Sequence, residues 1–133
     1  MSKDIRGKIY NQRRARQLKD FSGLRYGNIT PMDIDGIIEF KNKLFVFIEY
    51  KSFGSELGYG QRLCLSRLVA AINKGGIACV AIVADHAPNI CDEIDGAKAV
   101  VREYFYLGKW SIPEFETTTK AVVDWMHNKY VKD

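Results

Sequence analysis

Residues 33–51 read DIDGIIEFKNKLFVFIEYK, two runs rich in apolar residues on either side of the polar stretch KNK. Runs rich in Ile, Val and Phe with a short polar connection are typical of a β-hairpin. We therefore predict two antiparallel strands here. The charges of this segment stand near the tips of the strands: Asp33 and Asp35 at one end, Glu49 and Lys51 at the other. A strand that is only structural has its charges in turns or on its wet face, so this placement needs an explanation.

The rest of the chain alternates between helical and extended patterns. Apolar spacing predicts helices over about 3–21, 61–74 and 116–130, with KGG ending the second and Val122, Trp125 and Met126 facing inward in the third. The continuous apolar run 77–84 indicates a strand covered on both faces, and 98–107 indicates another. The fold class that follows is α/β, a central mixed sheet flanked by helices.

Length and composition are those of a single globular domain. The chain has 133 residues, of which 47% are hydrophobic and 27% charged. No segment reaches the roughly 18 apolar residues that a membrane span needs, and no apolar run marks the N-terminus for secretion. Three cysteines without C-x-x-C spacing favour neither a disulfide framework nor a structural zinc site. We expect an intracellular, cytoplasmic protein without a membrane partner.

Positive charge is concentrated at the N-terminus. Residues 1–26 hold eight basic and two acidic side chains, whereas the other 107 residues hold 12 basic and 14 acidic ones. The basic segment includes Arg13, Arg14, Arg16 and Lys19. Two interpretations stay open for it, an arm or helix that contacts phosphates and a solvated helix face that maintains solubility.

The register of the hairpin decides what its charges can do. If the turn is Lys41 to Lys43, Asp35 lies directly across from Glu49, and Asp33 across from Lys51; a loop of two or four residues would break this pairing. Two carboxylates roughly 5 Å apart repel unless a positive charge lies between them. Oxygen ligands without converging His or Cys suit Mg²⁺ or Mn²⁺. Lys51 would point the same way as Glu49, where it can orient or deprotonate a water or neutralise charge on a phosphate.

These residues resemble the signature of the PD-(D/E)xK nuclease superfamily, which has the restriction-endonuclease-like fold. The match consists of DID, then Glu49-Tyr50-Lys51, then the block YGQRLCLSRLVAAINKGGIACVAIVAD, and it covers roughly residues 29–85. The pattern is most similar to the virus-type replication-repair nuclease and Holliday-junction resolvase-like branch. The resemblance implies a catalytic core at 29–85, between the basic segment 1–26 and a strand and helix at 97–133.

In that family an Asp and an E-x-K bind metal and activate water. The resemblance therefore implies that Asp35, Glu49, Lys51 and Gln61 are catalytic, with Glu49 and either Asp35 or Asp33 holding the metal; we favour Asp35 because of the register. Many members also carry a Glu on the first helix, but this chain has no Glu before Glu39. The number of metal ions is therefore open.

The function predicted is metal-dependent hydrolysis of phosphodiester bonds in DNA. A domain of this size has little room to read a long sequence, so we expect recognition of DNA structure, with Arg62 and the basic segment as phosphate contacts. A catalytically inactive domain that binds nucleic acid or protein is the alternative. Asp85, at the end of the buried strand, either approaches the site or caps a loop. The sequence leaves open a homodimer, endo- or exonucleolytic cleavage, and the phage source at which the resemblance hints.

Overall fold

The computed structural model describes Arg6, residues 20–86 and residues 94–132. The chain divides into two compact units, Met1–Asp33 and Ile34–Asp133. The predicted helix at 3–21 falls almost entirely outside the described residues. In the described part of the first unit, the carboxylate of Asp20 accepts hydrogen bonds from the hydroxyl and the backbone N–H of Ser22, and both lower the pKa of Asp20. Tyr26 and Ile29 form an isolated antiparallel bridge.

The second unit is built on a five-stranded mixed sheet with the strand order β1-β2-β3-β4-β5. Its elements, in chain order, are β1 (Gly36–Phe40), β2 (Leu44–Ser52), α2 (Tyr59–Lys74), β3 (Ala78–His86), β4 (Val100–Tyr106), β5 (Lys109–Ser111) and α3 (Thr119–Tyr130). Strands β2 and β3 are parallel, and the other neighbours are antiparallel. The crossover between the parallel pair is α2. This arrangement confirms the predicted α/β class with a mixed sheet.

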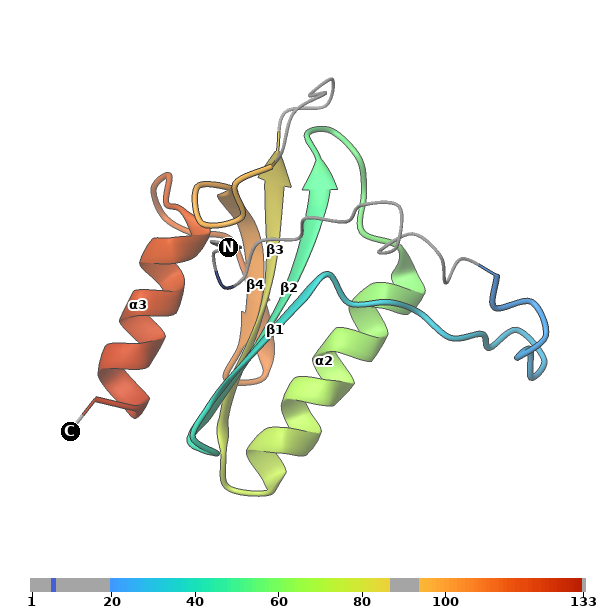
Figure 1. Cartoon of the computed structure of the whole chain (residues 1–133), viewed down its shortest axis with the longest axis horizontal. Helices are drawn as coiled ribbons and strands as arrows, with labels where there is room; N and C mark the ends of the chain where they lie inside the picture. Colours follow the sequence, from blue (N-terminus) through green and yellow to red (C-terminus); the bar gives the residue numbers. More distant parts are fainter. Residues whose placement is uncertain (1–5, 7–19, 87–93, 133) are drawn as a thin grey trace, which may run out of the picture. The chain divides into compact units, whose positions relative to one another are not determined.

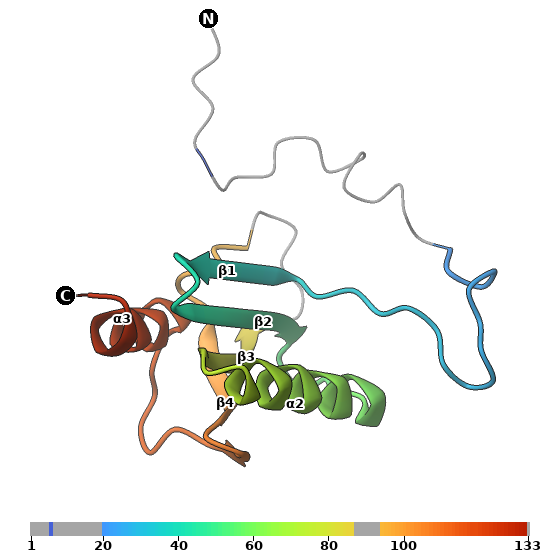
Figure 2. The same cartoon turned by 90° about the horizontal axis from the view of Figure 1, so that it is seen from below.

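One helix covers each face of the sheet (Figures 1 and 2). On the α2 face, Phe47 and Val83 form a buried cluster with Leu65 and Val69 of the helix. On the α3 face, the cluster contains Met126 and the alternate sheet residues, Val46, Ile48, Val80, Ile82 and Val101. Since successive side chains of a strand point to opposite faces, residue parity along β2 and β3 tells which helix a side chain faces.

Most predicted elements lie where the apolar pattern indicated. Helix α2 ends at Lys74, and Gly75 follows as the predicted glycine cap. Strand β3 runs two residues further than predicted, to His86. The break predicted at Gly108 is a tight turn: Leu107 and Gly108 have φ of 51° and 83°, which suits a two-residue hairpin turn and allows the short strand β5 to pair with β4.

The inward face of α3 was predicted only in part. Met126 is 1% exposed, as expected of a core position. Trp125 is 53% exposed, so its predicted inward position is wrong. Its indole lies against the ring of Tyr106, and its ring centre lies 5.2 Å from Nζ of Lys129. A large indole with polar neighbours is accommodated there without entering the core.

Candidate functional site

The turn between β1 and β2 has the length on which the site prediction depended. Phe40 pairs with Leu44 and Gly36 with Ile48, which leaves residues 41–43 as the loop. Lys41 and Asn42 adopt φ of 50° and 58°, and the N–H of Lys43 donates to the carbonyl of Phe40 at 2.8 Å. The three-residue turn predicted from KNK is therefore confirmed; the paired positions end at Gly36 and Ile48, one residue short of the predicted pair of Asp35 with Glu49.

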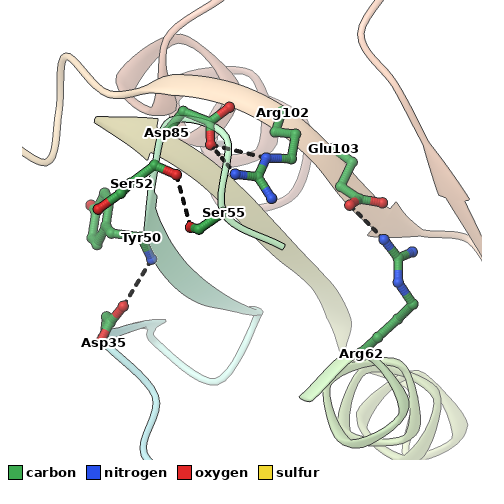
Figure 3. A network of polar contacts seen from close by, with 8 residues as sticks. All are labelled: Asp35, Tyr50, Ser52, Ser55, Arg62, Asp85, Arg102 and Glu103. Carbon is green, nitrogen blue, oxygen red and sulfur yellow. Dashed lines mark hydrogen bonds and ion pairs between the residues drawn. The ribbon is translucent and has the colours of Figure 1, made fainter. Parts of the chain in front are cut away.

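Asp35 stands where the ladder between β1 and β2 ends. Its Oδ2 atom accepts a hydrogen bond of 2.8 Å from the backbone N–H of Tyr50 (Figure 3). The side chain thus satisfies a β2 donor just beyond the last paired position, Gly36. Burial raises the pKa of the Tyr50 hydroxyl, and the negative charges of Asp35 and Asp95 raise it further. The Asp35 carboxylate is itself exposed to solvent.

Glu49 and Lys51 occupy alternate positions near the end of β2. They have the parity of Phe47 and so face the side of the sheet that α2 covers. Glu49 is only 4% exposed, although carboxylates are rarely buried in proteins. Lys51 is half-buried, and its Nζ atom lies 3.1 Å from Oε1 of Gln61. The structure thus brings together two of the predicted residues that are ten positions apart in the chain.

The start of α2 fixes the Gln61 amide. Gly58 precedes the helix in an extended conformation, and its N–H donates to Oε1 of Gln61 at 3.3 Å. The same oxygen therefore accepts from a helix-end backbone group and from Lys51. An amide oxygen held by two donors has little rotational freedom, which orients the Lys51 ammonium as well.

Two ion pairs that the sequence did not predict lie on the same face of the sheet. Arg62, the residue after Gln61, pairs with Glu103 at 2.6 Å, and its guanidinium lies 4.5 Å from the ring centre of Trp110. Arg102 pairs with Asp85 (Figure 3). Regular alternation along β4 would put the neighbours Arg102 and Glu103 on opposite faces of the sheet. Sequence reasoning therefore gave no reason to expect both on the face that α2 covers.

Other predicted residues lie outside the described part of the structure or in the first unit. Arg13, Arg14, Arg16 and Lys19 lie outside the described residues. Asp33 is exposed and is the last residue of the N-terminal unit, so its role stays a prediction. Among the residues that the structure describes, no three His, Cys, Asp or Glu side chains gather into a metal-binding group.

A pocket lies on the opposite face of the sheet. It has a volume of about 410 Å³ and is lined by aromatic and aliphatic residues of β4, α3 and the segment between β5 and α3, Tyr104, Phe115 and Trp125 among them. The hydroxyls of Tyr106 and Tyr130 are hydrogen-bonded to each other beside it, and burial raises the pKa of Tyr106. The pocket does not contain the polar residues of the α2 face.

No family model matches the chain, and neither the curated proteins nor the solved structures with which it was compared contain a match. Over the described ranges, no helix has the length and apolar content that crossing a membrane requires.

Proposed function

We propose that this protein is a nuclease that hydrolyses phosphodiester bonds in DNA with the aid of Mg²⁺ or Mn²⁺. The observation that carries the proposal is the contact between Lys51 and Gln61, 3.1 Å apart, next to a buried carboxylate on the same face. A lysine, an amide and carboxylates arranged in this order on a hairpin and a helix correspond to the PD-(D/E)xK pattern of the sequence. The restriction-endonuclease-like classification belongs to the same proposal.

The acidic residues fit a hard divalent cation with few protein ligands. Magnesium retains several waters and takes one or two carboxylates together with phosphate oxygens of the substrate. Asp35 and Glu49 would supply these carboxylates, one at the solvent-exposed end of the β1–β2 ladder and one on the α2 face. When bound there, such an ion would polarise the phosphate and lower the pKa of a coordinated water.

The remaining residues would act on the phosphate and the attacking water. The Lys51 ammonium donates a hydrogen bond to Oε1 of Gln61, so its positive charge is held in one position on β2, two residues after Glu49. A fixed ammonium stabilises charge that develops on phosphate oxygens, and it also orients a water for attack. Gln61 would keep Lys51 in place, which makes the amide a positioning group in this mechanism.

Binding of DNA would rely on further cations. Arg62 is oriented by Glu103 and by the ring of Trp110, and its side chain is 37% exposed. The basic segment at residues 1–26 would neutralise further phosphates. With few groups for reading bases, the protein would recognise branches, ends or nicks, and a homodimer would suit a substrate with two strands to cut.

The test is a cleavage assay on labelled linear, nicked, single-stranded and four-way-junction DNA with Mg²⁺, Mn²⁺ or EDTA. We expect cutting of at least one substrate that requires the metal and is abolished in Lys51→Ala. The matched control is Lys74→Ala, which removes an exposed cation at the opposite end of α2, about 20 Å from Gln61. This control should cut like the wild type.

The other outcomes separate the alternative functions. Salt-sensitive binding without cutting on any substrate would contradict the enzyme and support an inactive nucleic-acid-binding module. Neither binding nor cutting would contradict both.

A further inference from the structure

An irregularity between β3 and β4 places an arginine on the side of the sheet that carries Lys51. Val83 pairs with Glu103, but the next residue, Ala84, pairs with Val101, so Arg102 is an extra residue in β4. In a regular strand Arg102 would face away from its neighbour Glu103, toward α3. A bulge of this kind re-aims a side chain and is over-represented next to active sites.

The bulge directs the Arg102 guanidinium to Asp85. Its Nε atom donates to Oδ1 of Asp85 at 2.9 Å, and Nη2 donates to the same oxygen. Asp85 is the β3 partner of Lys51 in the parallel pairing and has the parity of Val83, which faces α2. Arg102 is therefore anchored at the level of Lys51, on the same face of the sheet.

Both hydrogen bonds from the Arg102 guanidinium to Asp85 end on one carboxylate oxygen. The most rigid arginine–carboxylate pairs use two parallel bonds to two oxygens, whereas both bonds here converge on Oδ1. The Arg102 side chain remains 23% exposed and that of Asp85 14% exposed. A guanidinium in this position has a further nitrogen, Nη1, with which to contact an oxyanion.

We propose that Arg102 binds a backbone phosphate of the nucleic acid beside the phosphate at Lys51, and that Asp85 holds its guanidinium in position for this contact. The inference rests on the proposed function, since it assumes a nucleic-acid strand across the α2 face. Guanidinium groups match the geometry of phosphate oxygens and are the preferred side chains for such contacts. The ligand class is a phosphodiester backbone, bound without regard to base sequence.

The test compares Arg102→Gln with Asp85→Asn, because the two substitutions remove opposite charges from one ion pair. Both are made in a Lys51→Ala background, so that cleavage does not disturb the measurement. Affinity for fluorescein-labelled duplex and four-way-junction DNA is measured by fluorescence anisotropy from 50 to 300 mM salt. Over this range, affinity that depends on phosphate contacts falls steeply with salt. Lys74→Ala in the same background is the control for the loss of one distant positive charge.

We expect Arg102→Gln to lower the slope of log affinity against log salt by about 0.9 and to weaken binding about tenfold near 0.1 M salt. Arg102→Lys should retain the slope because it keeps the charge. Asp85→Asn should bind at least as tightly as its parent, since asparagine keeps the Oδ1 acceptor that holds Arg102 and removes a competing negative charge. Lys74→Ala should match the parent.

A pair that only stabilises the fold would give a different result. Both substitutions would then lower the thermal midpoint and change the affinity for DNA in the same direction, and Arg102→Gln would leave the salt slope unchanged. A change of affinity in the same direction, or an unchanged slope, overturns the inference. If Arg102→Gln fails to fold, Asp85→Asn alone tests the inference, and weaker DNA binding by Asp85→Asn than by its parent contradicts it. Failure of the proposed function is seen separately, as the absence of metal-dependent cutting by the wild type, and a reduced slope would still support the phosphate contact.

Discussion

The Nζ atom of Lys51 lies 3.1 Å from Oε1 of Gln61, and the same oxygen accepts the N–H of Gly58 at the start of α2. A residue near the end of β2 is thereby tied to the first turn of the crossover helix. Helix α2 leads directly into β3, the parallel partner of β2. The positions of Lys51 and Gln61 are therefore linked to each other and to β3. Changes to Gln61 should consequently affect both the helix end and the proposed chemistry.

Gln61→Ala and Gln61→Glu should separate these two effects. Alanine removes the acceptor of the Gly58 N–H, and we expect a loss of about 1 kcal/mol in the free energy of unfolding, as for the loss of a helix cap. Glutamate keeps an acceptor oxygen and should preserve stability. Both should lower the single-turnover cleavage rate, alanine by releasing Lys51 and glutamate by adding negative charge near the phosphate. Urea denaturation and single-turnover kinetics measure the two properties, and a wild-type rate in Gln61→Glu would contradict the role given to the amide.

Asp35 has a structural and a proposed chemical role that one substitution can divide. Asparagine retains an oxygen that can accept a hydrogen bond from the Tyr50 N–H. The free energy of unfolding of Asp35→Asn should therefore be within about 0.5 kcal/mol of the wild-type value. It removes the negative charge, so the thermal stabilisation by Mg²⁺ and the metal-dependent cleavage should both be lost. Asp35→Ala should lose these and about 1 kcal/mol of stability as well.

The measurement is thermal denaturation with and without Mg²⁺, alongside the cleavage assay. Glu39→Gln is the control, because Glu39 lies near the other end of β1, is exposed and accepts only a turn hydrogen bond, from the backbone N–H of Asn42, among the contacts described. If Asp35→Asn retains full metal-dependent cutting, the metal ligand must be sought elsewhere, Asp33 first.

Stability should decrease at alkaline pH because of Cys79. Burial raises the pKa of this thiol from 9.0 to about 12. Between these values the unfolded chain ionises Cys79 while the folded chain keeps it protonated, so the unfolded state binds fewer protons and the free energy of unfolding falls as the pH rises. The burial of Tyr50 and Tyr106 raises the pKa of each and acts in the same direction above pH 10.

Urea denaturation at a series of pH values from 7 to 11 measures this dependence. Cys79→Ala should show a shallower decrease above pH 9 than the wild type, whatever its stability at pH 7. Identical slopes in the two proteins would mean that the thiol does not contribute.

The sequence predicted the parts of the site that depend on local rules. The polar stretch KNK between two apolar runs set the turn length, and turn length fixed which residues face each other across β1 and β2. Helix α2 and its glycine end followed from apolar spacing and from the residues GG. In each case, the residues that determine the structure lie within a few positions of the feature they determine.

The parts that sequence reasoning missed depend on contacts between distant segments. The bulge at Arg102 exists in the pairing of β4 with β3, and nothing in the local run VVREYF marks the extra residue. The exposed position of Trp125 depends on where Tyr106 of β4 lies, not on the helical period alone. The ion pairs of Arg62 and Arg102 likewise join residues 41 and 17 positions apart.

Gly96 should tolerate no side chain, because the hydroxyl of Tyr50 lies against it. A Cβ atom at Gly96 would lie 2.4 Å from the Tyr50 oxygen and 3.0 Å from the ring carbon that carries it, so one of the two segments must move. The hydroxyl also donates to the carbonyl of Gly96 at 3.2 Å. Tyr50 stands between Glu49 and Lys51, and its displacement would shift the end of β2 that carries them.

Gly96→Ala should therefore lower the free energy of unfolding by about 1–3 kcal/mol, the usual cost of overpacking. Gly60→Ala is the matched control: a Cβ there meets nothing within 4 Å, and alanine in the first turn of α2 should raise stability by about 0.5–1 kcal/mol. Adding Tyr50→Phe to Gly96→Ala removes the atom that clashes most and should recover part of the loss. If Gly96→Ala unfolds like the wild type in urea, or if Tyr50→Phe recovers nothing, the segment around residue 96 does not brace the strand that carries Glu49 and Lys51.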